Sequence, residues 1–426
     1  MYEGRESVYG RGHDPSSRRL LPPLAIAGRT LISPSSIDRV GGTVTATDTD
    51  RRTFVVESAD GSAEELEVEA GEKRHFSYEV GENYSSHPIE IPVTIINGDR
   101  PGTRLFLSAA VHGNEINGVK VIQQVANRYD PADIQGALVC LHVVNVPAYE
   151  AEERYLPIYD RDLNRSFPGL ADGSEASRMA KSIFDQFVTT CDVGLDFHTS
   201  TRNKLALMHA RADVDDDGVS RLVDGFGAEL VLSGTGSEGS LRREATAEGV
   251  PTATIEMGEE DRFQPVLIER AMNGVESVMA TYDLLEDTEP RDPEFVKVLD
   301  RDGEKTWLRA DTGGLVDMKW GPHPIVEEGE TVCVISDHFD EEKQVVSAPF
   351  TGLLIGILAN PRVLPGRPLI HLVELSPDER DAAESTFEEI GFQAQRTFHW
   401  MGGTGDDIVE TTLMDTENAD VSGRQG

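Results

Sequence analysis

The stretch AAVHGNEING, residues 109–118, places a histidine and a glutamate three positions apart, directly after an apolar run. His112 and Glu115 are residue types that bind Zn²⁺, which is well served by two imidazoles and one carboxylate, with the fourth position left to water. An H-x-x-E pair also arises often by chance. The pair therefore needs a third ligand from elsewhere in the chain before it indicates a metal site.

Other apolar runs of the chain also end in polar residues that are suited to chemistry. They are Asn145 in LHVVNVPAY, Asp196 and His198 in GLDFHTS, and Glu256 in TATIEMG. Because ligands of open α/β sheets collect at the carboxyl ends of the strands, we expect these residues to converge in space. His112, Glu115 and His198 would then complete a metal site, and Glu256 would be left over as a general base.

Amide and cationic side chains could bind a substrate in the same cleft. The loop DRDLNRSFPG contains Asn164 and Arg165, whose planar donors suit a carboxylate. Arg154, and either Arg242 or Arg243 of SLRREATAEG, could supply further positive charge.

Between about residues 88 and 290, apolar runs of strand length alternate with helical patterns. TRLFLSAAV, GALVCLHVVNV, CDVGLDF and PTATIEM are separated by segments such as NGVKVIQQVANRY and EASRMAKSIFDQFVTT. This alternation predicts an α/β fold around a largely buried sheet.

The predicted organisation has four parts. Residues 1–87 form an N-terminal extension with a small β segment, residues 88–290 the α/β domain, residues 291–378 a C-terminal β module, and residues 379–426 an acidic tail. The β module contains two half-repeats and resembles a biotinyl/lipoyl-type β-sandwich. Such carrier modules present a lysine in a hairpin between the halves. Only Lys343 lies between the halves here, and its local sequence argues against a carrier role.

The composition describes a folded protein with an extreme acidic balance. Of its 426 residues, 38% are hydrophobic and 27% charged, and the formal net charge is −37. Such a chain repels polyanions, which argues against nucleic acids and anionic membranes as partners. Lysine is scarce beside arginine, at 8 residues against 31, a pattern that resembles cytoplasmic proteins of salt-loving microbes. Without a signal-peptide pattern or a run of ~18 apolar residues, a soluble cytoplasmic protein is expected.

The ordered motifs VHGNEING, DLNRSFPG, DFHTS and TIEMG resemble the succinylglutamate desuccinylase/aspartoacylase family of zinc amidohydrolases, over roughly residues 88–375. The resemblance implies a mixed sheet flanked by helices, as in zinc carboxypeptidases, and one Zn²⁺ per chain. It also implies hydrolysis of the amide bond of an N-acyl amino acid or similar small acylated amine, and it leaves a homo-oligomer open. The residues that match are His112, Glu115 and His198 as zinc ligands, Glu256 as catalytic glutamate, Arg154 facing the scissile carbonyl, and Asn164 and Arg165 on a substrate carboxylate.

Two other functions stay open on the sequence. A zinc carboxypeptidase acting on peptides would use the same metal set and the same Asn–Arg pair, and an open groove would favour it. A non-catalytic zinc-binding protein is the second alternative. The presence of Glu256, which zinc does not need as a ligand, argues against it.

Other ionisable residues have a structural interpretation. His142 is expected to be a core histidine, and His209 could line the pocket although a structural role is favoured. Asp196 could orient a metal-bound imidazole or cap a strand end. The remaining residues expected to be structural or on the surface are His323, His338 and His371 in the β module, the acidic run Glu259, Glu260 and Asp261, and Cys140, Cys191 and Cys333, which lack metal or redox spacing.

Overall fold

A long mixed β-sheet is the framework of the protein. The computed structural model describes residues 53–56, 66–157, 159–201, 203–293, 296–299, 305–319, 324–384 and 386. Within these ranges thirteen strands join one sheet, whose main path is β12-β19-β17-β8-β10-β7-β5-β6-β4-β3. The strands are β3 (Lys73–Glu82), β4 (Pro88–Asn97), β5 (Arg100–Ala109), β6 (Gln135–Leu141), β7 (Val193–Ser200), β8 (Lys204–Ala212), β9 (Leu230–Ser233), β10 (Thr252–Glu259), β11 (Lys297–Leu299), β12 (Lys305–Arg309), β14 (Ile325–Val326), β17 (Gly352–Leu358) and β19 (Pro368–Glu374).

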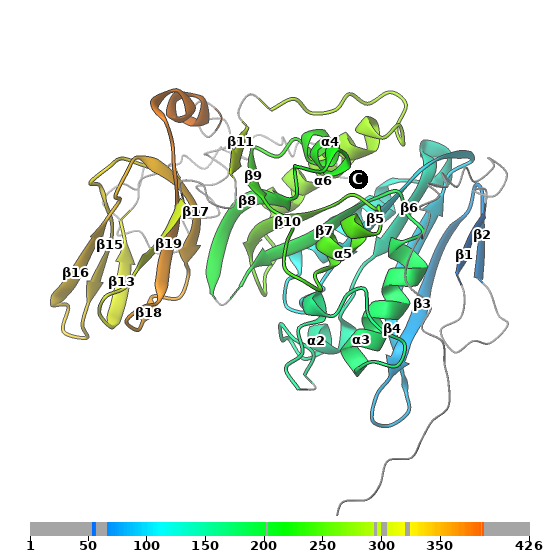
Figure 1. Cartoon of the computed structure of the whole chain (residues 1–426), viewed down its shortest axis with the longest axis horizontal. Helices are drawn as coiled ribbons and strands as arrows, with labels where there is room; N and C mark the ends of the chain where they lie inside the picture. Colours follow the sequence, from blue (N-terminus) through cyan, green and yellow to red (C-terminus); the bar gives the residue numbers. More distant parts are fainter. Residues whose placement is uncertain are drawn as a thin grey trace, which may run out of the picture. The chain divides into compact units, whose positions relative to one another are not determined.

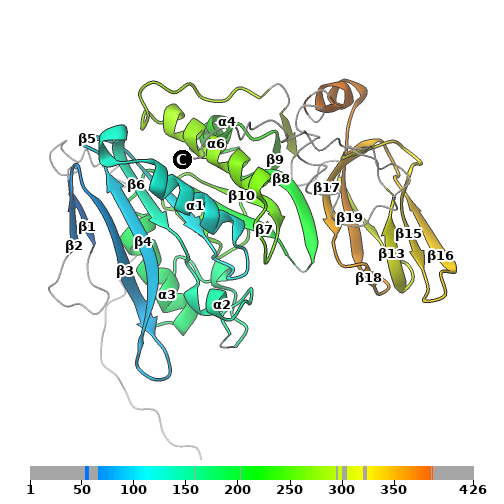
Figure 2. The same ribbon diagram turned by 180° about the vertical axis from the view of Figure 1, so that it is seen from behind.

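Helices cover both faces of the central strands. Figure 1 shows α2, α3 and α5 on the near face, and Figure 2 shows α1, α4 and α6 on the opposite face. The helices are α1 (Asn117–Arg128), α2 (Val146–Glu150), α3 (Glu175–Ile183), α4 (Asp217–Phe226), α5 (Leu241–Ala247) and α6 (Pro265–Thr281), with short helical turns at Pro131–Asp133, Leu163–Arg165 and Phe184–Val188. The predicted mixed sheet flanked by helices is therefore confirmed.

The central strands are nearly continuous apolar runs because both of their faces are buried. Strands β5, β7 and β10 run parallel to one another, and β8 pairs antiparallel with β10. Side chains alternate between two cores, so that Leu107 and Leu195 pack with α1, α4 and α6, whereas Phe106 packs with α3 and α5. The side chains of Ser108 and Asp196 share the second face, on which the site described below is built.

The sequence marks the ends of the helices with polar caps. The Ser174 side chain accepts a hydrogen bond from the backbone N–H of Ser177 at the start of α3, and Asp216 caps α4 in the same way. Helix α4 ends at Gly227, whose φ of 68° lies in the left-handed region that glycine adopts without strain.

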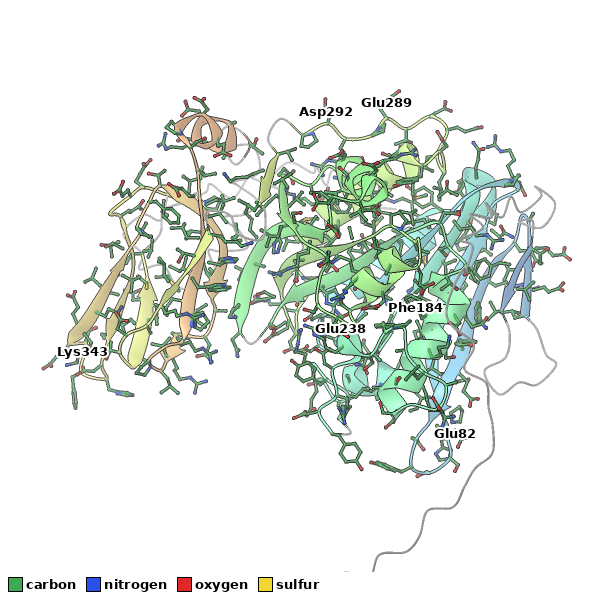
Figure 3. All side chains as sticks on the ribbon, in the orientation of Figure 1. Glu82, Phe184, Glu238, Glu289, Asp292 and Lys343 are labelled. Atoms are coloured by element: carbon green, nitrogen blue, oxygen red, sulfur yellow. The ribbon has the colours of Figure 1, made fainter. Side chains whose placement is uncertain are left out.

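The C-terminal strands fall into two groups. A four-stranded sheet has the order β16-β15-β13-β18, with bounds β13 (Gly314–Met318), β15 (Thr331–Ser336), β16 (Glu342–Ser347) and β18 (Arg362–Val363). Strands β17, β19 and β12 instead extend the main sheet, because β17 pairs antiparallel with β8. In β16, the Lys343 ammonium (Figure 3) pairs with Asp337 and Glu341 at 2.9 and 3.1 Å. The likeness to a biotinyl/lipoyl sandwich stays a prediction.

The described residues all belong to the compact unit of residues 46–426, and the domain boundaries stay predictions. On the N-terminal side, β1 (Thr53–Val56) and β2 (Leu66–Glu69) form a two-stranded antiparallel sheet. His323 and most of the predicted acidic tail lie outside the described residues. No helix among the residues described is both long and apolar enough to cross a membrane.

Candidate metal centre

Two strand ends and one loop bring the predicted metal ligands together. His112 and Glu115 lie in the turn between β5 and α1, and His198 lies near the end of β7, the strand that pairs in parallel with β5. The three residues are only 3%, 1% and 4% exposed, respectively. Since parallel neighbours end at the same edge of the sheet, residues 86 positions apart become neighbours.

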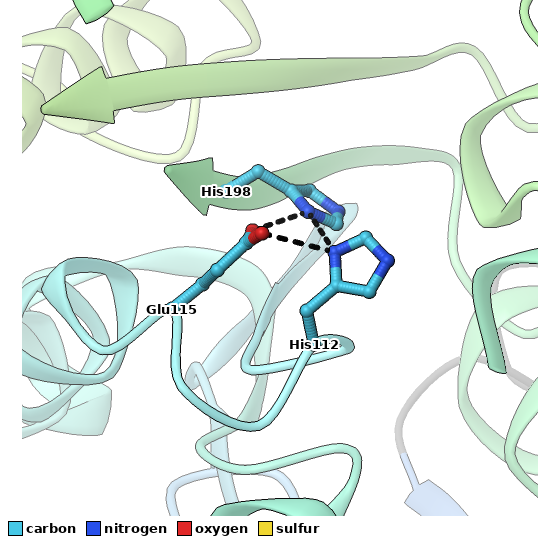
Figure 4. Close-up of side chains that lie close together, drawn as sticks. All are labelled: His112, Glu115 and His198. Carbon is cyan, nitrogen blue, oxygen red and sulfur yellow. Dashed lines mark hydrogen bonds and ion pairs between the residues drawn. The ribbon is translucent and has the colours of Figure 1, made fainter. Parts of the chain in front are cut away.

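The ligand atoms are spaced as a metal ion requires (Figure 4). The two Nδ1 atoms of His112 and His198 are 3.1 Å apart, and Glu115 oxygens lie 3.2 Å from His112 Nδ1 and 2.8 Å from His198 Nδ1. A tetrahedral ion with Zn–N bonds of ~2.0–2.1 Å would separate two ligand nitrogens by roughly 3.3 Å. The donor set and its spacing therefore fit a small divalent metal ion.

Each imidazole contacts a carboxylate through Nε2, the ring nitrogen that points away from the other ligands, and this contact orients the ring. His198 Nε2 lies 2.7 Å from Asp196 Oδ2, and the Ser108 hydroxyl donates to the other oxygen of Asp196 at 2.8 Å. His112 Nε2 lies 3.2 Å from Asp162 Oδ1. Both rings thus present Nδ1 to the centre, which is the role of orienting carboxylates in metal sites. Of the two interpretations of Asp196, the structure supports the orienting one.

The charges of this cluster are strongly coupled. Burial raises the pKa of the Glu115 carboxyl, but His112 and His198 outweigh it and hold this pKa well below its usual range. Burial lowers the pKa of His198, but Asp196 and Glu115 outweigh it and raise this pKa well above the usual value. Glu115 is consequently an anionic ligand, and a metal ion would displace a proton from His198 on binding.

Arg154 contacts the ligand cluster directly. Its guanidinium pairs with Glu115 Oε1, and its Nη2 lies 3.0 Å from His112 Nε2. The side chain is 22% exposed, and its donors point at the same small volume as the ligands. Arg154 can therefore reach an oxygen atom of a substrate held there.

Glu256 lies beside the cluster without joining it. On β10 it is directly opposite His198 of β7, and its carboxylate pairs with Arg211 of β8 at 2.9 Å. The side chain is 16% exposed. Glu256 lines the cavity and is not one of the three candidate metal ligands. Its carboxylate is therefore free to act as a general base on a molecule bound there.

A cavity of about 870 Å³ opens over these residues, and all nine predicted site residues line it. Asn164 Oδ1 accepts a hydrogen bond from the backbone N–H of Leu241 at 2.9 Å, which ties its loop to α5. The two segments meet closely at Gly239, where a Cβ would lie 2.4 Å from the carbonyl oxygen of Arg165. Arg165 itself is 49% exposed, so its guanidinium can reach a ligand in the cavity.

Both arginines of α5 line the cavity, but in different ways. Arg242 donates to the Gly234 carbonyl at 2.6 Å, and burial lowers its pKa to about 10. It stays protonated at neutral pH, and the charges of Asp196 and Glu256 act on it. Arg243 is 42% exposed and lies 3.8 Å from Glu244. Arg242 is thus the more deeply placed cation of the pair.

The other predicted strand-end residue, Asn145, has a structural position. It is fully buried, its Oδ1 accepts from the N–H of Ala148 at the start of α2, and its Nδ2 donates to the Val111 carbonyl. Asn145 therefore fixes the backbone of Val111, the residue before His112, and is not among the residues that line the cavity.

The histidines divide differently from the prediction. His142 is outside the cavity lining, its Nε2 bonds to the Thr94 hydroxyl at 2.7 Å, and burial lowers its pKa to about 4. His338 is exposed in the turn after β15. His209 and His371, for which a structural role was favoured, both line the cavity. His209 thus has the pocket-lining position that the sequence left open, and pairing between distant strands adds His371, while the roles of both stay predictions.

The predicted solvated acidic run is partly buried, which corrects that prediction. The Glu259 side chain is 15% exposed and pairs with Arg262 at 2.8 Å, and Glu260 accepts from the N–H of Asn203 at 2.8 Å. Asp261 alone is exposed. Cys140, Cys191 and Cys333 are buried free thiols.

Two further residues that contact the predicted site residues are not among those predicted from the sequence. Asp162, which contacts His112, lies in the loop DRDLNRSFPG beside the predicted residues Asn164 and Arg165. Arg211, which pairs with Glu256, follows His209 by two residues on β8. The alternation of a strand could have placed Arg211 on the same face, whereas Asp162 carries no periodic signal.

Comparison with known proteins agrees with this geometry. The succinylglutamate desuccinylase/aspartoacylase catalytic domain family matches residues 101–282, which contain all nine predicted site residues. The N-alpha-acetyl-L-2,4-diaminobutyric acid deacetylase of Halomonas elongata is 26% identical over 258 residues, which cover 58% of this chain and 75% of that protein.

Solved structures share the fold. A succinylglutamate desuccinylase from a Silicibacter species superposes with a TM-score of 0.62 at 24% identity, over 71% of this chain and 95% of that one. The product-bound ectoine utilization protein of Ruegeria pomeroyi gives a TM-score of 0.63 at 22% identity, with the same coverage.

Proposed function

The chain belongs to the succinylglutamate desuccinylase/aspartoacylase family, and we propose that it is a zinc-dependent hydrolase of the amide bond of N-acyl amino acids or similar small acylated amines. The observation that carries the proposal is the buried cluster of His112, Glu115 and His198, with Glu256 beside it as a carboxylate outside the ligand set. Deacylation is also the activity named for the Halomonas relative.

In this proposal the ligand cluster holds one Zn²⁺ per chain. A zinc ion bound there would polarise the amide carbonyl and acidify a water molecule. Asp196 and Asp162 keep both imidazole rings turned so that Nδ1 faces the ion.

The other residues act on water and substrate. Glu256 takes a proton from the attacking water and passes it to the leaving nitrogen, while Arg154 donates to the carbonyl oxygen as negative charge develops. Asn164 and Arg165 hold a substrate carboxylate, and Arg242 supplies further positive charge from α5. The acyl carbon thus becomes a carboxylate and the nitrogen a free amine, without a covalent acyl-enzyme.

The C-terminal module shapes the cavity mouth in this proposal. Trp307, His371 and Lys305, from β12 and β19, line the same cavity as the ligand cluster. A wall of this kind favours small substrates over long peptides, which supports deacylation over the carboxypeptidase alternative.

The reaction is tested by measuring amine release from a substrate panel in multimolar KCl with added zinc. The panel contains N-acetyl-L-aspartate, N-succinyl-L-glutamate, N-alpha-acetyl-L-2,4-diaminobutyrate and short peptides, with the Glu256→Gln variant as the blank. Turnover of an acyl amino acid that the blank lacks is the expected result. Cleavage of peptides alone would support a carboxypeptidase, and no turnover by folded, zinc-loaded protein would contradict the proposal.

Replacing the orienting carboxylate should weaken zinc binding. Asp196→Asn leaves the shape intact but weakens the acceptor for His198 Nε2, so zinc affinity should fall about 10- to 100-fold. Competition against a chelating dye measures this affinity. Asp224→Asn, on an exposed position of α4, should bind zinc like the wild type. Equal affinities of the two variants would show that Asp196 does not support the ligand.

We also propose that the protein works in a salt-rich cytoplasm, because its net charge is −37. Raising salt from 0.1 M to 1 M shortens the screening length from ~10 to ~3 Å and so weakens the repulsion among its acids. The melting temperature and the activity should therefore fall when KCl drops well below molar. A melting temperature that does not change between 2 M and 0.1 M KCl would exclude this adaptation.

A further inference from the structure

His209 lies at the far end of a row that begins at the metal ligands. Its Cα is directly opposite Glu256 of β10, which is directly opposite His198 of β7. Side chains at opposite positions of neighbouring strands point to the same face of a sheet. All three residues line the cavity, with Glu256 between the two histidines.

One of the two ring nitrogens of His209, Nε2, makes no hydrogen bond to any described residue. The residue is 4% exposed, and its Nδ1 donates to the Leu207 carbonyl at 2.8 Å. Its Nε2 is buried and has no hydrogen-bond partner among the described residues. Burial, helped by the charge of Arg211, lowers its pKa to about 3, so the ring is neutral and Nε2 is an acceptor.

The charges in the cavity indicate which group would meet this acceptor. The described lining contains three acids, of which Glu115 belongs to the ligand cluster, Glu238 is exposed and Glu256 pairs with Arg211. The lining also has seven cations, namely Arg154, Arg165, Lys204, Arg211, Arg242, Arg243 and Lys305. These donors suit the carboxylate and carbonyl groups of an N-acyl amino acid, whereas its amide N–H needs an acceptor.

We propose that His209 accepts a hydrogen bond from the N–H of the scissile amide and thereby positions the leaving nitrogen beside Glu256. This inference rests on the proposed function, because it assigns a residue to the same reaction. Held in this way, the nitrogen turns its developing lone pair to Glu256, which delivers the proton as the C–N bond breaks. His209 itself neither gives nor takes a proton.

The test compares an amide with an ester that lacks the N–H. The first pair is N-acetyl-L-aspartate and O-acetyl-L-malate, and the same pairing is made for whichever acyl amino acid of the panel is cleaved fastest. His209→Phe should lower kcat/KM on the amide about 10- to 100-fold and on the ester less than about 3-fold. His209→Gln, which keeps an acceptor, should recover part of the amide activity. His142→Phe, a matched change outside the cavity, should alter neither.

The alternative outcomes separate the two proposals. If His209→Phe lowers amide and ester hydrolysis equally, or leaves the amide rate unchanged, the inference is wrong while the proposed function stands. If the wild type cleaves no acyl amino acid of the panel, the proposed function fails and the inference fails with it. Melting curves in KCl establish that each variant is folded.

Discussion

Glu256→Gln is expected to keep one zinc ion per chain while lowering kcat for acyl amino acid hydrolysis by about 10²- to 10⁴-fold. Glutamine has nearly the shape of glutamate, but its amide cannot take a proton from the attacking water. Glu256 contacts Arg211 and none of the ligand atoms, so its loss should leave the cluster intact. Kinetics on the panel and elemental analysis of the same sample measure both quantities.

The control for this variant is Glu342→Gln, on an exposed position of β16. It removes the same charge from an acidic protein and should keep the wild-type rate. A Glu256→Gln enzyme that works at nearly the wild-type rate would exclude Glu256 as the base. Loss of zinc together with the rate would instead make Glu256 part of the metal site.

His198→Ala is expected to lose tight zinc binding and to lower kcat at least about 10³-fold, since metal catalysis contributes several kcal/mol to such reactions. The imidazole supplies one of the three ligands and contacts Glu115 Oε2 at 2.8 Å. Without it Glu115 keeps its charge in a buried position with one partner fewer, which should also lower the melting temperature of the metal-free protein. Zinc titration and thermal unfolding measure the two effects.

An exposed histidine provides the comparison for this ligand. His338→Ala should bind zinc and hydrolyse the substrate like the wild type, because its side chain lies in a turn outside the cavity. If His198→Ala bound one zinc ion tightly and kept its rate, the ligand assignment would be wrong.

The convergence of His112, Glu115, His198 and Glu256 could be predicted because it depends on local patterns. Each residue follows or ends an apolar run of strand length, and parallel strands place such ends at one edge of a sheet. The structure brings the four side chains together along β5, β7 and β10. Their chemical roles stay predictions until variants are measured.

The far wall of the cavity could not be predicted in this way. Trp307 and His371 reach it because β17 pairs with β8 across more than 140 residues of chain, and β19 and β12 follow β17 in the sheet. The sequence of a short β-strand in the C-terminal module does not indicate which other strand it will pair with. For the same reason the sequence gives no indication that His371 of β19 lines the cavity.

The choice between Arg242 and Arg243 also needed the structure. Both lie in the first turn of α5, where neighbouring positions point about 100° apart around the helix. How each side chain turns depends on how α5 packs, and the contact of Arg242 with the Gly234 carbonyl makes it the more deeply placed of the two, while their roles toward substrate stay predictions.

The measurement that tests the central claim most directly is a zinc titration of chelator-stripped protein in multimolar KCl, with amine release from the best panel substrate followed at each step. The account predicts that activity rises with added zinc and reaches its plateau at one ion per chain, while Glu256→Gln binds the same ion and stays inactive. Full hydrolysis by the stripped protein, or a saturated zinc site without any hydrolysis, would contradict it.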